Sequence, residues 1–137
     1  MDVMQIRLLL DFGMLVLIWI IQLVVYPSFC AFTPDDLKRW HGSYVRRISY
    51  VVMPLMILQV IVIIWQAWLE LNVYTVGSFV LVCALWLITF LRFVPMHNSI
   101  AESGDCGTLS RKLTQLNGWR TLLWTVLFVW SFILALS

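Results

Sequence analysis

Residues 73–98 read VYTVGSFVLVCALWLITFLRFVPMHN, and this stretch decides the fold. Its first part, 73–91, contains no charged residue. It is long enough for one helical crossing of a bilayer, which takes roughly 20 apolar residues. Arg92 and Pro95 then end the apolar run. The stretch therefore predicts a membrane-spanning helix that stops at a basic, polar boundary.

Three more apolar stretches accompany this one, at about 8–32, 49–69 and 121–136. The 137-residue chain is 62% hydrophobic and 12% charged, which is about half the charge of an ordinary soluble domain. The pattern predicts one all-α domain over residues 1–137, an integral membrane four-helix bundle in contact with the lipid bilayer. It excludes a soluble fold, and a net charge of +2 gives no reason to expect nucleic acid as a partner.

The positive charges predict how the bundle is oriented. Eight of the nine Lys and Arg residues fall in the segments 32–48 and 92–120, whereas the turn at 70–74 has none. Short loops rich in Lys and Arg stay in the cytoplasm, so both termini are expected to face outward (N-out, C-out). Asp11 and the long apolar run after it argue against a cleavable signal peptide. The expected location is a bacterial inner (plasma) membrane.

A helix-start signal follows the first span. Thr33 can cap a helix, Pro34 suits the first helical position, and the two aspartates after it favour the positive end of the helix dipole. We therefore expect a cytoplasmic amphipathic helix over 37–48. This helix either lies at the membrane surface or leads into the second span.

Two further features shape the expected helices. Pro54 lies in the first turns of the second span and is expected to kink it. Residues 97–107 are the least apolar part of the chain and contain two glycines. They predict a polar loop, after which a helix restarts at Thr108 or Leu109.

Polar residues within the spans are expected to face the bundle, because an unpaired polar group in hydrocarbon is costly. Gln59 and Gln66 are seven residues apart on the second span, and Ser78 lies on the third. Interhelical hydrogen bonds are the expected role of all three. Asp11 lies near the outer end of the first span, where a solvated position at the rim is favoured over a proton relay.

The strongest group of chemistry-bearing residues lies on the cytoplasmic side. His41 and Tyr44 are three residues apart and share one helix face. All four spans have an end on this side, so we expect polar residues from several of them to line one pocket under the membrane surface. The expected pocket residues are His41, Tyr44, Arg47, Arg92, His97, Asn98, Asn117 and Arg120.

Three interpretations of these residues stay open. The two histidines can ligate a metal or haem, since imidazole suits zinc, copper and iron. Alternatively His41, His97, Tyr44 and Arg120 are catalytic, with histidine as general acid or base and arginine holding an anionic oxygen. The remaining residues, Arg92, Asn98, Asn117 and Arg47, would then bind the substrate. The third interpretation is that all are interfacial residues, satisfied by backbone, lipid phosphate or a neighbouring protein.

Two segments, RFVPMHNSI at 92–100 and LNGWRTLLW at 116–124, resemble the anthrone-oxygenase-like family of small four-span membrane proteins. In that family a Pro-x-x-Asn-like element ends the third span, and Trp or Asn followed by Arg opens the fourth. The stretch YPS at 26–28 is similar to the exit of the family's first span. The resemblance implies that Asn98 and Arg120 share one site, and that the substrate is a lipophilic aromatic or quinone-like molecule undergoing oxidation.

The leading functional hypothesis is a membrane protein whose polar pocket binds a lipophilic small molecule. Its chemistry would be that of an oxidoreductase or isomerase acting on a quinone-like or aromatic substrate. The alternative is a non-catalytic accessory or assembly subunit that docks on a larger membrane complex, and a homo-oligomer is compatible with both. The three cysteines, Cys30, Cys83 and Cys106, show no metal-ligand spacing and do not suggest a disulfide framework.

Overall fold

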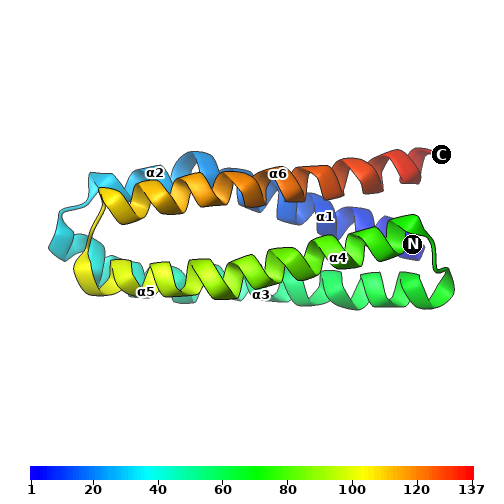
Figure 1. Ribbon diagram of the computed structural model, residues 1–137, viewed down its shortest axis with the longest axis horizontal. Coiled ribbons are helices and arrows are strands. Elements are labelled where there is room, and N and C mark those ends of the chain that lie inside the picture. The colour runs from blue at the N-terminus through cyan, green and yellow to red at the C-terminus, as the bar shows by residue number, and fades with distance from the viewer.

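The computed structural model describes residues 1–137 and shows four long helical rods packed side by side (Figure 1). All four are long and apolar enough to cross a membrane, so the predicted all-α bundle is confirmed and the protein is an integral membrane protein. The first rod comprises α1 (Val3–Ile20), the π-helical η1 (Ile21–Val25), α2 (Tyr26–Ser28) and the 3₁₀-helical η2 (Phe29–Ala31). The others are α3 (Pro34–Leu69), then α4 (Val73–Ile88) with the π-helical η3 (Thr89–Phe93) and α5 (Val94–Ser103), and finally α6 (Thr108–Leu136).

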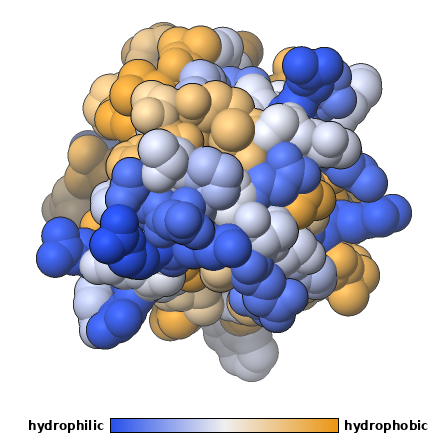
Figure 2. Space-filling view, turned by 90° about the vertical axis from the view of Figure 1, so that its left-hand side faces the viewer, coloured by the Kyte–Doolittle hydropathy of each residue, from blue (hydrophilic) through white to orange (hydrophobic).

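The two ends of the bundle differ in character. Both termini and the turn between α3 and α4 lie at one end, which we call the terminal end (Figure 1). The connections at 32–33 and 104–107 lie at the opposite end, which we call the basic end. Figure 2 looks onto the basic end, where hydrophilic side chains spread across the face and apolar ones lie at its margins. This separation is what the distribution of Lys and Arg predicts; which end faces the cytoplasm stays a prediction.

The predicted helix after the first span begins where its cap indicates. The Thr33 hydroxyl accepts a hydrogen bond from the backbone N–H of Asp36, and Pro34 occupies the first helical position. Of the two expected arrangements the structure shows the second, because residues 37–48 lead without a break into the second span as part of one helix of 36 residues. Pro54 lies inside this helix, and the chain remains helical on both sides of it.

The predicted polar loop at 97–107 is wrong for most of its length. The third rod continues to Ser103, and only 104–107 connect it to α6, which starts at Thr108 as predicted. Outside hydrocarbon a helix does not need apolar side chains. The polar composition of 97–103 therefore did not reveal that these residues are helical. Gly104 ends α5 in the left-handed region with φ of 65°, and its Cα packs against the backbone of Pro34. The connection therefore folds against the start of α3.

The interior divides into two hydrophobic clusters. One lies in the middle of the bundle and draws residues from all four rods: Met14, Ile18, Met56, Ile63, Val82, Leu85, Trp124 and Leu127. The other lies toward the basic end and consists of Ile21, Tyr26, Phe29, Leu37, Phe93, Ile100 and Leu113. Many large apolar side chains on the flanks remain exposed, among them Leu23, Val80 and Leu87, and these face the lipid.

Candidate functional site

A pocket of about 200 Å³ lies toward the basic end, between α3 on one side and η3 with α5 on the other. Its walls are mainly apolar. Both π-helical segments contribute to it, Ile21 from η1 and Thr89, Phe90 and Phe93 from η3. A π turn holds one residue more than an α turn, and such turns are frequent at functional sites. The polar residues that line the pocket are Tyr26, Tyr44, Ser49, Thr89, His97, Asn98 and Arg120.

The two histidines, which come from different rods, meet beside this pocket. Nδ1 of His97 lies 3.0 Å from Nε2 of His41, and the two ring centroids are 5.0 Å apart in a stacked arrangement. His41 is completely buried behind His97, and Phe29 packs edge-on against it at 5.2 Å. His97 therefore faces the pocket, whereas His41 can act on the pocket only through His97.

Tyr26 extends the histidine pair into a chain of three groups. Its hydroxyl lies 3.3 Å from Nε2 of His97. In one arrangement the Tyr26 hydroxyl donates to Nε2 of His97, and Nδ1 of His97 donates to Nε2 of His41. In the other arrangement both bonds run in the opposite direction, from His41 to His97 and from His97 to Tyr26. The other ring nitrogen of His41, Nδ1, is buried and has no hydrogen-bond partner. A proton passed from the pocket through Tyr26 and His97 would therefore stop at Nε2 of His41 and leave that ring as an imidazolium, because its Nδ1 proton has no acceptor.

Arg120 brings a buried positive charge to the same pocket. Its side chain is 5% exposed, and its Cζ lies 4.2 Å from the centroid of the Phe93 ring. Nη1 donates to the Asn117 amide oxygen at 3.3 Å, and Nε has no partner. The two ion pairs of the chain, Arg7–Asp11 and Arg39–Asp36, do not involve it. Buried charges in proteins are ordinarily paired with an opposite charge. The guanidinium of Arg120 has no anionic oxygen in that role.

Asn117 supports Arg120 from behind. Its amide nitrogen donates to Oε1 of Gln22 at 2.9 Å, and Nε2 of Gln22 donates to the Thr114 carbonyl at 3.2 Å. These bonds orient the Asn117 amide so that its oxygen faces Arg120. Asn117, expected to bind substrate, does not line the pocket. It positions the arginine instead.

The other predicted residues divide between the pocket and the surface. Tyr44 and Asn98 line the pocket. Arg92 is exposed and does not, because the π-helical η3 adds a residue to the turn and rotates Arg92 off the face that α-helical spacing predicts. Arg47 is also exposed and lines a separate hollow on the outer face of α3, beside Trp40.

The histidine pair is a poor match for a metal or haem. Nε2 of His41 and Nδ1 of His97 contact each other, and Nε2 of His97 contacts Tyr26. Three of the four ring nitrogens are therefore engaged in hydrogen bonds. No group of three or more His, Cys, Asp or Glu side chains lies together anywhere in the chain. The arrangement suits proton exchange better than ligation.

Sequence reasoning missed two features of the interior. The first is Tyr26, which is 3% exposed and contacts His97 but was not among the expected pocket residues. Its one signal was its place just before Pro27 at the end of the first span. The second missed feature is Arg7, which is fully buried at the terminal end. Its signal was the presence of an opposite charge four residues later.

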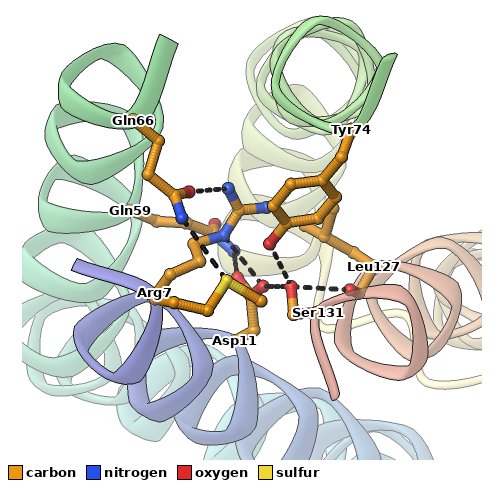
Figure 3. Close-up of polar contacts among 8 residues, drawn as sticks. Arg7, Asp11, Gln59, Gln66, Tyr74, Leu127 and Ser131 are labelled. Carbon is orange, nitrogen blue, oxygen red and sulfur yellow. Dashed lines mark hydrogen bonds and ion pairs between the residues drawn. The ribbon is translucent and has the colours of Figure 1, made fainter. Parts of the chain in front are cut away.

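Arg7 and Asp11 form a fully buried ion pair (Figure 3). Nε of Arg7 lies 2.9 Å from Oδ2 of Asp11, and both side chains are 0% exposed. The carboxylate also accepts hydrogen bonds from Gln59 and Ser131. The expected solvated position of Asp11 at the rim is therefore wrong.

The same network joins all four rods (Figure 3). Nη1 of Arg7 donates to Oε1 of Gln66 at 3.1 Å, and the hydroxyls of Tyr74 and Ser131 are 2.7 Å apart. Interhelical hydrogen bonding is confirmed for Gln59 and Gln66. The Ser78 hydroxyl is buried without a partner, so its expected bond is absent. Asp11 neutralises Arg7 in this cluster, although Nη2 of Arg7 and Oε1 of Gln59 are buried without hydrogen-bond partners. Arg120 differs because no carboxylate pairs with it.

No family model, curated protein or solved structure matches this chain. The resemblance to the anthrone-oxygenase-like family stays a prediction from three short segments. The function of this protein therefore has to be inferred from the pocket at the basic end.

Proposed function

We propose that the pocket binds the polar ring of a lipophilic small molecule and exchanges protons with it. This is the task of an oxidoreductase or isomerase that acts on a quinone-like or aromatic substrate. The observation that carries the proposal is Arg120, a buried guanidinium that lines the pocket without a carboxylate partner. A ligand oxygen with full or partial negative charge would supply the missing partner, because hydrogen bonds to a charged group are the strong ones.

The size and position of the pocket support a ring as the bound part. Its volume of about 200 Å³ lies below the about 300–1,000 Å³ of sites that enclose a whole drug-sized ligand. Phe90 and Val94 line it and are themselves 45% and 43% exposed on the flank of the bundle. The ligand's ring would therefore sit inside, and its apolar chain would leave past these residues into the lipid.

The chain from Tyr26 through His97 to His41 supplies the proton chemistry. Reduction of a quinone-like ligand to its hydroquinone takes two electrons, which a soluble nicotinamide or flavin would supply, and two protons. A histidine of the pair in its protonated form would deliver one proton through Tyr26 to the oxygen beside Arg120, and water would supply the other. In an isomerase, the same chain would remove a proton from one ligand atom and return it to another. Positioned acid–base groups of this kind typically contribute about 10²–10⁴-fold to a rate.

Binding of a decyl-chain benzoquinone and of its hydroquinone tests the proposal. The purified protein is titrated with each in detergent, and binding is followed by quenching of tryptophan fluorescence. Arg120→Gln should raise Kd about 10- to 100-fold, since a hydrogen bond to a charged group contributes about 1.5–3 kcal/mol. Arg92→Gln removes the same charge from an exposed position on η3, and it should leave Kd within about twofold because solvated charges contribute little.

The matched variant separates specific binding from partition of the quinone into micelles. Equal affinities of Arg120→Gln, Arg92→Gln and the unchanged protein would contradict the proposal. The accessory-subunit hypothesis would then be the better one, and proteins that copurify with the chain would be the next object of study.

A further inference from the structure

The three free cysteines lie in different surroundings. Cys83 is exposed on the lipid-facing flank of α4, whereas Cys30 is exposed in η2 and Cys106 is half-buried in the connection between α5 and α6. Cys30 and Cys106 are 76 residues apart in sequence, yet the Cys30 thiol contacts the Cys106 backbone carbonyl. Cys30 and Cys106 are therefore neighbouring residues at the basic end, and Cys83 lies apart from them on α4.

The fold itself holds the two cysteines together. Gly104 packs against the backbone of Pro34, which anchors the α5–α6 connection. On the other side, the Ser110 hydroxyl donates to the backbone carbonyl of Tyr26 at 3.2 Å, which ties the start of α6 to the end of the first rod. Cys106 also packs against the hydrophobic cluster at the basic end. The proximity of Cys30 and Cys106 thus follows from the Gly104–Pro34 contact on one side and the Ser110–Tyr26 hydrogen bond on the other.

We propose that Cys30 and Cys106 are a thiol-modification site that forms a reversible internal disulfide with low-molecular-weight disulfides as oxidants. The exposed Cys30 thiolate attacks one sulfur of oxidised glutathione, releases one glutathione thiolate and forms a mixed disulfide. Cys106 then attacks the Cys30 sulfur and releases the second glutathione. One glutathione disulfide is reduced to two glutathione thiols while two protein thiols become one disulfide, so electrons and protons balance.

The location of the pair fits a transient disulfide better than a permanent one. The basic end is the end expected to face the cytoplasm, where disulfides are mostly transient and sense redox state. The link would join the end of the first rod to the connection that precedes α6. Phe29, the neighbour of Cys30, packs against His41, so oxidation would clamp a segment beside the histidine pair. The cysteines lie outside the pocket, so this proposal stands or falls independently of the proposed ligand.

The test counts free thiols in the full-length protein in membranes. The Cys83→Ser variant is equilibrated with oxidised glutathione, quenched with acid and labelled with a polyethylene-glycol maleimide, which retards the protein on a gel once per free thiol. Reduced protein should carry two labels and oxidised protein none. Intact mass distinguishes an internal disulfide, which loses two hydrogens, from a glutathione adduct, which gains mass.

Two single-cysteine changes serve as controls. Cys106→Ser leaves Cys30 with the remote Cys83, and Cys30→Ser leaves Cys106 with Cys83. Neither variant should form an internal disulfide under conditions that fully oxidise Cys83→Ser. The proposal is overturned if Cys83→Ser keeps both labels while the same protein unfolded in detergent loses them. It is equally overturned if only glutathione adducts or disulfide-linked dimers form.

Discussion

Replacement of Asp11 by Asn tests how much the buried Arg7–Asp11 ion pair contributes to the stability of the fold. The change preserves the size of the side chain but leaves the guanidinium of Arg7 buried without its counter-charge. Removal of one partner from a buried ion pair typically costs about 3–5 kcal/mol. No second carboxylate pairs with Arg7, and the carboxylate of Asp11 accepts bonds from three side-chain donors, those of Arg7, Gln59 and Ser131. The amide nitrogen of Asn can be accommodated opposite Gln59, because the free Oε1 of Gln59 accepts once that amide turns over, so the expected loss comes from the missing counter-charge.

The expected loss is therefore about 3–5 kcal/mol in the free energy of unfolding, measured by SDS titration in mixed micelles with helix content followed by circular dichroism. Asp2→Asn is the matched control, since Asp2 caps the same helix from an exposed position and Asn caps about as well. Replacement of both members of the ion pair, as Arg7→Met with Asp11→Leu, should cost less than Asp11→Asn alone. A loss below about 1 kcal/mol for Asp11→Asn, the size of an exposed pair, would refute the reasoning.

The remaining predictions concern close packing and the proton chain. Gly77→Ala should destabilise the protein by about 1 kcal/mol in the same titration, because an added Cβ would lie 2.8 Å from the Trp130 ring and overpacking outweighs the gain in helix propensity. Gly42→Ala, with nothing within 4 Å of the added Cβ, should instead stabilise it by about 0.5–1 kcal/mol; destabilisation of both to the same extent would contradict this. Tyr26→Phe should cost about 0.5–1.5 kcal/mol and shift the ring-nitrogen resonances of His97 in ¹⁵N-histidine spectra, whereas unchanged spectra would show that the hydroxyl does not contact that histidine.

The four spans could be predicted because lipid imposes a simple rule on the chain. A segment that crosses hydrocarbon must be apolar and must satisfy its own backbone groups, and both requirements are visible in composition. The polar helix Val94–Ser103 could not be predicted in this way, since outside the membrane a helix and a loop can have the same composition. Its helical state depends on packing, as the burial of Ile100 shows.

The pocket was partly predictable, because helix ends that emerge on one side of a membrane bring their polar residues together. His97, Asn98 and Arg120 could be assigned to one region on that basis. The exclusion of Arg92 could not be foreseen, since the sequence of 89–93 carries no mark of a π turn. The burial of Arg7 was overlooked for a different reason: charge near a terminus is usually solvated, and only its spacing from Asp11 pointed inward.

The two π-helical segments, η1 and η3, also affect how relatives of this protein should be compared with it. A π turn is an α-helix that holds one inserted residue. A homologue without the turn would therefore align with a one-residue gap inside 21–25 or 89–93, in the middle of an apolar rod rather than in a loop. Alignment methods penalise such gaps within helices and would instead shift every later residue by one position. His97, Asn98 and the other pocket residues after the gap would then be aligned with non-equivalent residues of the homologue. Related sequences would appear less similar than they are.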